Sequence, residues 1–167
     1  MKDQILDFCI VDNNEKDLFI GDEFDNCLLG VCSSFGDFTP AYDLDKIISV
    51  LVKKHKITED EAIKRFNIDI LENHSNLVFI KLSDEIESDL SVYNNSMLFL
   101  DGYGSSCMIG VCIRQGCEIV AAYSDSDCVE WLIENDDMTE EDAIEFFEYN
   151  TRGSYIGEHT PVFVTLL

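Results

Sequence analysis

A segment near the start of the chain recurs in its second half. Leu18–Cys32 (LFIGDEFDNCLLGVC) matches Leu98–Cys112 (LFLDGYGSSCMIGVC) eighty residues later, with the same residue at six positions. Two further segments match in the same order, Ile57–Ile63 with Met138–Ile144 and Val78–Ile80 with Val162–Val164. A repeat of this length corresponds to a whole supersecondary unit. The sequence therefore predicts one unit used twice.

The repeat sets the expected architecture. We expect an α+β fold of two tandem β-β-β-α-α-β repeats related by pseudo-twofold symmetry, with helices packed on a mainly antiparallel sheet. The expected domains are residues 1–83, the first repeat with an N-terminal strand, and 84–167, the second repeat. Two copies are too few for a solenoid, which buries its core over three or more units.

Strands are expected where apolar runs are bounded by turn residues. Cys27–Cys32 is apolar except at Gly30, which is typical of a central strand covered on both faces. Pro40 predicts that the strand of residues 38–42 lies toward an edge. The other expected strands are residues 4–11, 18–20, 77–82, 97–100, 107–113 and 118–123.

Helix start signals recur in both copies. Asp43 or Asp45, and Ser124 or Asp125, can cap the first helix of each copy through their side-chain oxygens. Thr58 with Glu61 forms a capping box for the second helix, and Thr139 opens its counterpart.

The cysteines predict buried thiols rather than a metal site. Cys27 and Cys32 are five residues apart on an expected strand, as are Cys107 and Cys112, so each pair faces opposite sides of the sheet. One pair cannot then clamp a single ion. We expect reduced thiols, no metal and no cofactor.

The charge is strongly negative and unevenly distributed. The chain carries 34 acidic against 11 basic residues, a net charge of −23, and Arg114 and Arg152 are the only cations after Lys81. Direct binding to nucleic acid is disfavoured, because it depends on cations that neutralise phosphates. There is no long apolar run or secretory leader, so we expect a soluble, cytoplasmic protein without membrane contact.

Acidic residues concentrate on one expected helix and the start of the next. They predict a surface for a basic host protein, of which a nucleic-acid-binding protein is one candidate; the alternative is a merely solvated face. The candidate contact residues are Asp125, Asp127, Glu130, Glu134, Asp136, Asp137, Glu140 and Glu141.

The C-terminal part resembles a known group of sequences. The run Met138–Asn150 (MTEEDAIEFFEYN), followed by Gly153–Glu158 (GSYIGE) and Thr160–Phe163 (TPVF), resembles the signature of small uncharacterised proteins of tailed bacteriophages. The resemblance covers about residues 97–167. It implies a viral origin, hence the cytoplasm of a host cell, and transfers no catalytic role.

Two other segments are candidate sites. The loop carrying Tyr155, Gly157, Glu158 and His159 could bind a ligand, although its glycines are equally explained by a need for positive φ. The acids at positions 22, 23 and 25 resemble part of a calcium loop, but the remaining ligands are missing. No residue combination predicts a catalytic centre.

Three functions remain open at this level. The first is a non-enzymatic inhibitor or decoy that presents carboxylates to a basic host protein. The second is an interaction or assembly module whose acids serve solubility. The third is a small-molecule binder or enzyme that uses the loop from Tyr155 to His159. The sequence favours the first and leaves the oligomeric state open.

Overall fold

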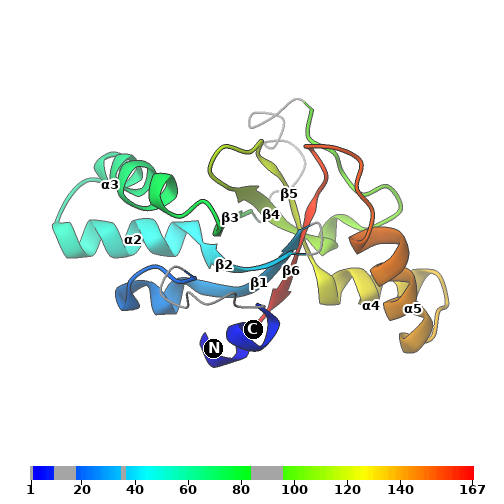
Figure 1. Ribbon diagram of the computed structural model, residues 1–167. Coiled ribbons are helices and arrows are strands. Elements are labelled where there is room, and N and C mark those ends of the chain that lie inside the picture. The colour runs from blue at the N-terminus through cyan, green and yellow to red at the C-terminus, as the bar shows by residue number, and fades with distance from the viewer. Residues whose placement is uncertain (1, 10–17, 35–36, 84–95) are drawn as a thin grey trace.

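The computed structural model describes residues 2–9, 18–34, 37–83 and 96–167. Figure 1 shows a central sheet with one pair of helices on each side of it. The strands are β1 Leu28–Ser34, β2 Asp37–Asp43, β3 Val78–Leu82, β4 Met108–Ile113, β5 Val120–Ser124 and β6 Val162–Leu166. The α-helices are α1 Lys2–Phe8, α2 Leu44–His55, α3 Glu59–Arg65, α4 Asp125–Asn135 and α5 Glu140–Phe146. The fold is therefore α+β, as the sequence predicts.

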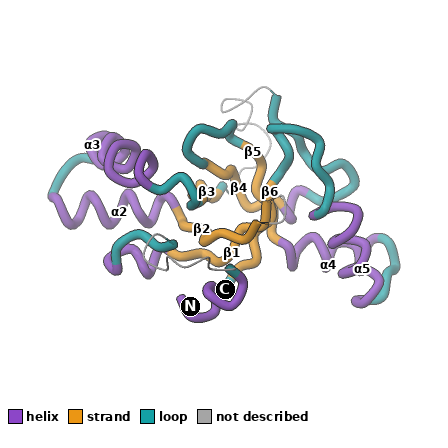
Figure 2. The backbone as a smooth tube through the Cα atoms, in the orientation of Figure 1, coloured by secondary structure: helices purple, strands orange, loops and turns teal. Residues whose placement is uncertain are grey.

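The sheet is a closed barrel in the order β1-β2-β3-β4-β5-β6, whereas the sequence predicted a mainly antiparallel sheet and did not predict its closure. Strands β2 and β3 are parallel, as are β5 and β6, and the four other pairs are antiparallel. A parallel pair requires a crossover connection, which α2–α3 and α4–α5 supply. Both halves of the chain contribute three strands to one barrel (Figure 2).

Two glycines allow the halves to close on each other. The register of β1 with β2 shifts between Leu28 and Gly30, and that of β4 with β5 shifts between Met108 and Gly110. A Cβ at Gly30 would lie 1.9 Å from the carbonyl oxygen of Thr165. Irregularities of this kind bend a sheet, and here they allow β6 to pass close to β1.

The strand expected at residues 4–11 is wrong. Residues 2–8 form α1, and residues 10–17 lie outside the described part of the chain. Ile5 and Cys9 are buried and four residues apart, which places them on the same face of one helical turn. A closed barrel also has no free edge to which a further strand could be added.

The short strands expected at residues 18–20 and 97–100 are also absent from the described structure, where these segments are irregular. Tyrosine hydroxyls on the barrel take the place of strand partners. The amide of Ile20 donates to Tyr42 Oη at 3.3 Å, and the amide of Leu100 donates to Tyr123 Oη at 3.1 Å. Each half is consequently β-β-α-α-β rather than β-β-β-α-α-β.

The remaining strand predictions hold to within a few residues, with one correction of position. Strand β2 is not an edge strand, because it pairs with both β1 and β3. Pro40 is tolerated because the pairing with β3 involves only Ala41–Asp43, so no hydrogen bond to β3 is needed from position 40.

The helix caps agree with the sequence. Asp43 accepts a hydrogen bond from the amide of Lys46 at the start of α2, and Ser124 accepts one from the amide of Asp127 at the start of α4. Thr58 and Glu61 form the predicted capping box. Both second helices continue into a π-helical turn, at residues 66–70 and 147–152, and these turns place bulky side chains against the barrel.

Three apolar clusters form the core. Nine small or branched side chains from all six strands fill the barrel interior, including Cys32 and Cys112. The other clusters lie between the outer barrel surface and each helix pair, and they contain Cys27 and Cys107 respectively. The paired cysteines therefore face opposite sides of the sheet, as expected, but Cys27 and Cys107 lie in the 3-10 turns before β1 and β4, so strand alternation is not the reason.

The two halves make corresponding contacts. Phe66 packs edge-on against Phe79 at a centroid distance of 4.9 Å, and Phe147 packs edge-on against Phe163 at 5.2 Å. The proposed boundary at residues 84–95 lies outside the described residues. Among the helices described, none is long and apolar enough to cross a membrane.

Candidate functional site

The eight candidate acids lie on α4, on the turn after it and at the start of α5. Six are exposed: Glu130, Glu134, Asp136, Asp137, Glu140 and Glu141. Asp127 is partly buried in the first turn of α4. Asp125 points inward, so it does not belong to the exposed surface with which the sequence grouped it. The name "acidic surface" is used below for the six exposed residues.

The acidic surface has no equivalent on the other helix pair. Helices α4 and α5 contain eight acidic and no basic residues. Helices α2 and α3 contain four acidic and five basic residues. Because both pairs connect and cover the barrel in the same way, the fold does not require this imbalance.

Several of these acids stand where a helix disfavours them. The C-terminus of a helix carries partial negative charge, and each nearby charge interacts with it by roughly 0.3–1 kcal/mol. Helix α2 ends in Lys53, Lys54 and His55, whereas α4 has no basic residue in its last turn and is followed by Asp136 and Asp137. The residue with left-handed φ after the helix is Lys56 in the first half and Asp137 in the second.

A buried charged cluster lies where the start of α4, the end of the second π-helical turn and β6 meet. Asp125 Oδ2 accepts a hydrogen bond of 2.7 Å from Thr165 Oγ1 and lies 3.5 Å from Arg152 Nη1. Arg152 also pairs with Glu148, and its guanidinium lies 5.8 Å from the ring centre of Phe38. The Asp125 side chain is 14% exposed, and its Oδ1 is buried without a hydrogen-bond partner in the described part of the protein.

Burial raises the pKa of Asp125 above its usual value of 3.8. The hydrogen bond from Thr165 and the charge of Arg152 oppose this shift, and the charge of Glu148 adds to it. Desolvation disfavours the ionised carboxylate, whereas a donor or a cation favours it.

The sequence did not identify Arg152, Thr165 or Glu148 as members of this cluster. Arg152 could have been predicted as the partner of a buried acid, because it is one of only two cations in the second half and a buried carboxylate needs a cation nearby. The corresponding positions in the first half are Leu44, Leu71 and Lys81, so the Asp125–Arg152–Thr165 combination occurs in the second half alone.

A cavity of about 480 Å³ opens between α4 and α5 above this cluster. One wall is apolar and consists of Val129, Ile133, Ile144 and Phe147. The polar lining consists of Asp125, Ser126, Glu130, Glu140, Glu148, Arg152 and Thr165. The name "α4–α5 groove" is used below for this cavity. Four carboxylates and one guanidinium surround it, which gives the groove a net negative charge.

The loop predicted to bind a ligand lies at a different place. Tyr155 and Glu158 line a second cavity of about 270 Å³, together with Arg114, Gly116, Cys117 and Glu118. Gly157 adopts φ +126°, and its carbonyl accepts hydrogen bonds from the amide and hydroxyl of Thr160. Gly157 thus serves the turn, while His159 is partly buried and is not among the lining residues.

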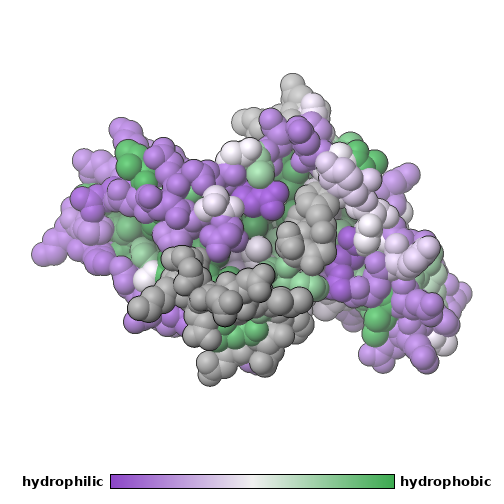
Figure 3. Space-filling model, viewed as in Figure 1, coloured by the Kyte–Doolittle hydropathy of each residue, from purple (hydrophilic) through white to green (hydrophobic). Residues whose placement is uncertain are grey.

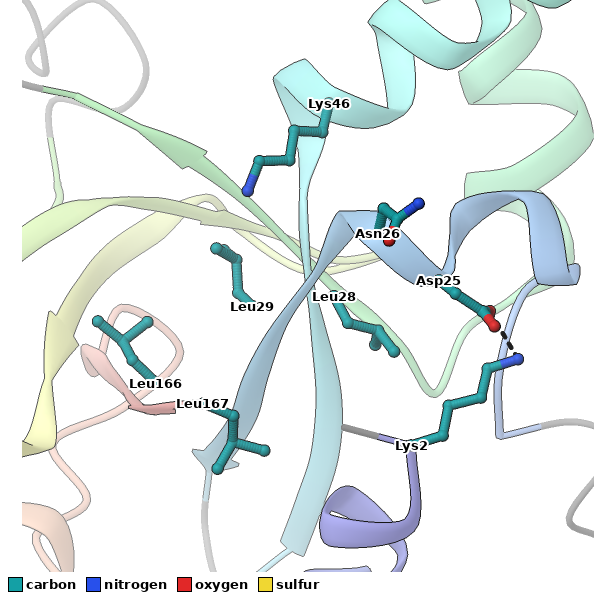
Figure 4. Close-up of a pocket in the computed structure, with 8 residues that line it drawn as sticks. All are labelled: Lys2, Asp25, Asn26, Leu28, Leu29, Lys46, Leu166 and Leu167. Carbon is teal, nitrogen blue, oxygen red and sulfur yellow. Dashed lines mark ion pairs between the residues drawn. The ribbon is translucent and has the colours of Figure 1, made fainter.

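A third cavity, of about 600 Å³, lies between α1, β1, α2 and the end of β6 (Figure 4). Lys2 extends to Asp25, with 2.6 Å between Nζ and Oδ1, and also pairs with Asp22. Lys46 lies over Leu29 in the figure and pairs with Asp43 at 3.2 Å. Both ammonium groups therefore already have carboxylate partners, which lowers their capacity to attract an anion.

The fragment with acids at positions 22, 23 and 25 does not assemble a calcium loop. Asp22 and Asp25 pair with Lys2, and Glu23 pairs with Lys54 at 2.7 Å. Within residues 2–9, 18–34, 37–83 and 96–167, no group of three or more histidine, cysteine or acidic side chains is placed to hold a metal ion.

Comparisons of the chain with protein-family models, with characterised proteins and with solved structures find no match.

Proposed function

We propose that this chain is a non-enzymatic accessory protein of bacteriophage type, which uses its acidic surface to bind and inhibit, or act as a decoy for, a basic nucleic-acid-handling protein of the bacterial host. It would act in the cytoplasm of that host. The viral origin is supported by the C-terminal resemblance. The binding role is supported by the distribution of charge over an otherwise matched pair of helical layers.

The placement of Glu134, Asp136 and Asp137 at the C-terminus of α4 carries the proposal. The matched first-half turn has His55 and Lys56 at the positions of Asp136 and Asp137. Acids at this end oppose the helix dipole, and their crowding adds repulsion. If only the stability of the fold mattered, neutral or basic residues would therefore be favoured at these positions. A requirement to present negative charge to a partner accounts for their presence.

The proposal also assigns different roles to the halves. We infer that the chain consists of two copies of a β-β-α-α-β unit related by a pseudo-twofold axis. Matching strand registers, caps and aromatic contacts support this inference. The first copy would complete the barrel, while the second would carry the contact surface.

The hydrophilic residues seen over both helix pairs in Figure 3 do not by themselves favour binding, because solvated helices are normally polar. The sign of the charge is the relevant property. Basic proteins that handle nucleic acid neutralise phosphates with lysine and arginine. A surface that carries acidic and no basic side chains can compete with nucleic acid for those lysines and arginines.

The test is a pull-down from bacterial lysate with the immobilised protein, eluted first with duplex DNA and then with salt. The expected result is a discrete basic nucleic-acid-binding protein released by the DNA, because both ligands would occupy the same site. The matched control bait carries Asp136→His, Asp137→Lys, Glu140→Gln and Glu141→Asn, which replaces four of the six acids of the acidic surface. Equal capture by both baits would contradict the proposal.

A specific observation favours a second candidate function, binding of a small molecule. Tyr155 and Glu158 line the 270 Å³ cavity beside Arg114 and the exposed Cys117. Arg114 Nε donates a hydrogen bond to Cys117 Sγ at 3.2 Å, so a thiol and a cation lie together at the cavity wall. Concave sites with a few convergent polar groups are typical of ligand binding.

A further inference from the structure

We propose that the α4–α5 groove binds an arginine side chain that lies between apolar residues of the basic partner. This inference rests on the proposed function and names the site at which the partner would be recognised. It requires a binding mode with an apolar component, which a purely electrostatic decoy surface would lack.

The shape and composition of the groove match a long cationic side chain. Ile144 is 45% exposed although it adjoins the buried Phe147, so the groove leaves apolar surface in water. Burial of such surface contributes about 25 cal/mol per Å². The methylene stem of an arginine, or an apolar residue next to it in the partner, would cover this surface.

The charges around the groove select a cation. Glu130 and Glu140 line it and are exposed, and among the side chains described neither takes part in an ion pair. Arg152 is the single basic residue of the lining, and Asp125 and Glu148 already engage it. An anion would therefore meet repulsion from the rim and find no free guanidinium.

Asp125, at the base of the α4–α5 groove, adds to the preference of the groove for a cation. Its Oδ2 is satisfied by Thr165, but its Oδ1 is buried and unpartnered, so part of its negative charge is uncompensated beneath the groove. Charges in a poorly solvated environment act more strongly than charges in water. A guanidinium offers five donors in a planar fork, which suits several carboxylates better than a compact ammonium does.

The first half supplies the contrast. Leu44 and Leu71 occupy the positions of Asp125 and Arg152, and the exposed Ile63 corresponds to Ile144. Glu59 corresponds to Glu140 at the start of the helix. The first half thus has similar surface residues without a carboxylate at the position of Asp125; its buried carboxylate, Asp43, is paired with Lys46. It therefore provides position-matched controls.

The experiment is a calorimetric titration with a synthetic amphipathic peptide of leucine and arginine, in parallel with the same peptide containing citrulline, its neutral isostere, in place of arginine. Amide chemical shifts identify the contact residues. We expect the arginine peptide to bind, the citrulline peptide to bind at least about tenfold more weakly, and the shifts to concentrate on α4 and α5.

Four variants locate the site. Ile144→Ser and Glu140→Gln should each weaken binding of the arginine peptide several-fold, while the matched Ile63→Ser and Glu59→Gln should leave it unchanged. All four positions are exposed, so the fold is preserved in each case.

The outcomes separate this inference from the proposed function. If Glu140→Gln weakens binding and Ile144→Ser does not, the groove is not occupied and the inference fails, while an electrostatic surface remains. If neither peptide binds but the lysate partner is captured in a charge-dependent manner, the inference fails and the proposed function stands. If the citrulline peptide binds as tightly as the arginine peptide, cation selection is refuted.

Discussion

Arg152 Nη1 lies 3.5 Å from Asp125 Oδ2 in the second half, whereas leucines occupy both corresponding positions, 71 and 44, in the first. At this location the second half therefore has an ion pair, and the first half has two apolar side chains. Ion pairs with limited solvent access are often no more stabilising than apolar residues of similar volume. We therefore propose that this pair serves binding rather than stability.

This relationship predicts that replacing Arg152 and replacing Asp125 lower the free energy of unfolding by different amounts, and that the two effects are not additive. Arg152→Leu should lower the free energy of unfolding by about 2 kcal/mol, because it leaves Asp125 without its cation. Asp125→Leu should cost less, since Arg152 retains Glu148. The double variant should recover the stability of the natural chain, because it reproduces the first-half packing. Urea unfolding of the four proteins measures these differences, and simple additivity of the two losses would refute the argument.

The pH dependence of stability follows from the same carboxylate. Burial raises the pKa of Asp125 above 3.8, so the folded state holds this proton more tightly than the unfolded state. Its contribution to stability is fully present below the unfolded pKa and is lost as the pH rises through the folded pKa. Urea unfolding of the natural chain and of Asp125→Asn over this range measures it. The stability of the natural chain relative to the variant should fall with rising pH; a rise would contradict the assignment.

Thiol reactivity should follow burial. Cys27, Cys32, Cys107 and Cys112 are buried in the three apolar clusters. Burial raises the pKa of Cys27 to about 11, and contact with Cys112 followed by burial raises that of Cys32, so little thiolate forms at neutral pH. Cys117 is the exposed thiol. A maleimide should modify it first, and mass spectrometry of the natural chain and of Cys117→Ser should show one fast site against none. Fast labelling of Cys32 in the native protein would be inconsistent with a packed barrel interior.

Local sequence signals predicted the parts of the fold that depend on neighbouring residues. Asp43, Ser124, Thr58 and Thr139 cap helices because each cap needs only the amides of the next turn. The sequence also predicted that Cys27 and Cys32 face opposite sides of the sheet, and they do, although Cys27 lies in the 3-10 turn before β1 and not on the strand.

Barrel closure could not be read from the sequence, since it depends on pairings between distant strands. Strand β6 pairs with β1 only if the chain passes Gly30 closely, and nothing near position 30 identifies Thr165 as the neighbour. The inward position of Asp125 likewise depends on Arg152 and Thr165, which lie 27 and 40 residues further along the chain. The exposure of the six residues of the acidic surface needed no such partners, and their role in binding stays a prediction.

The last prediction concerns four of the six residues of the acidic surface. Replacing Asp136, Asp137, Glu140 and Glu141 with their amides should weaken binding of the lysate partner and of the arginine peptide by at least about tenfold at low salt. Stability should change little, because all four are exposed; loss of two unfavourable charges after α4 offsets loss of two favourable ones in the first turn of α5. Binding by the natural chain should also fall as salt rises, since screening acts over about 10 Å at 0.1 M salt.

Two control variants test whether the loss of binding is specific to the acidic surface. Glu59→Gln with Asp60→Asn removes the matched first-half acids and should leave binding intact, which separates the acidic surface from total charge. Tyr155→Phe with Glu158→Gln alters the wall of the 270 Å³ cavity and should also leave it intact. Undiminished binding by the four-amide variant, together with loss in the cavity variant, would favour the small-molecule function, because recognition would then depend on the loop rather than on the helices.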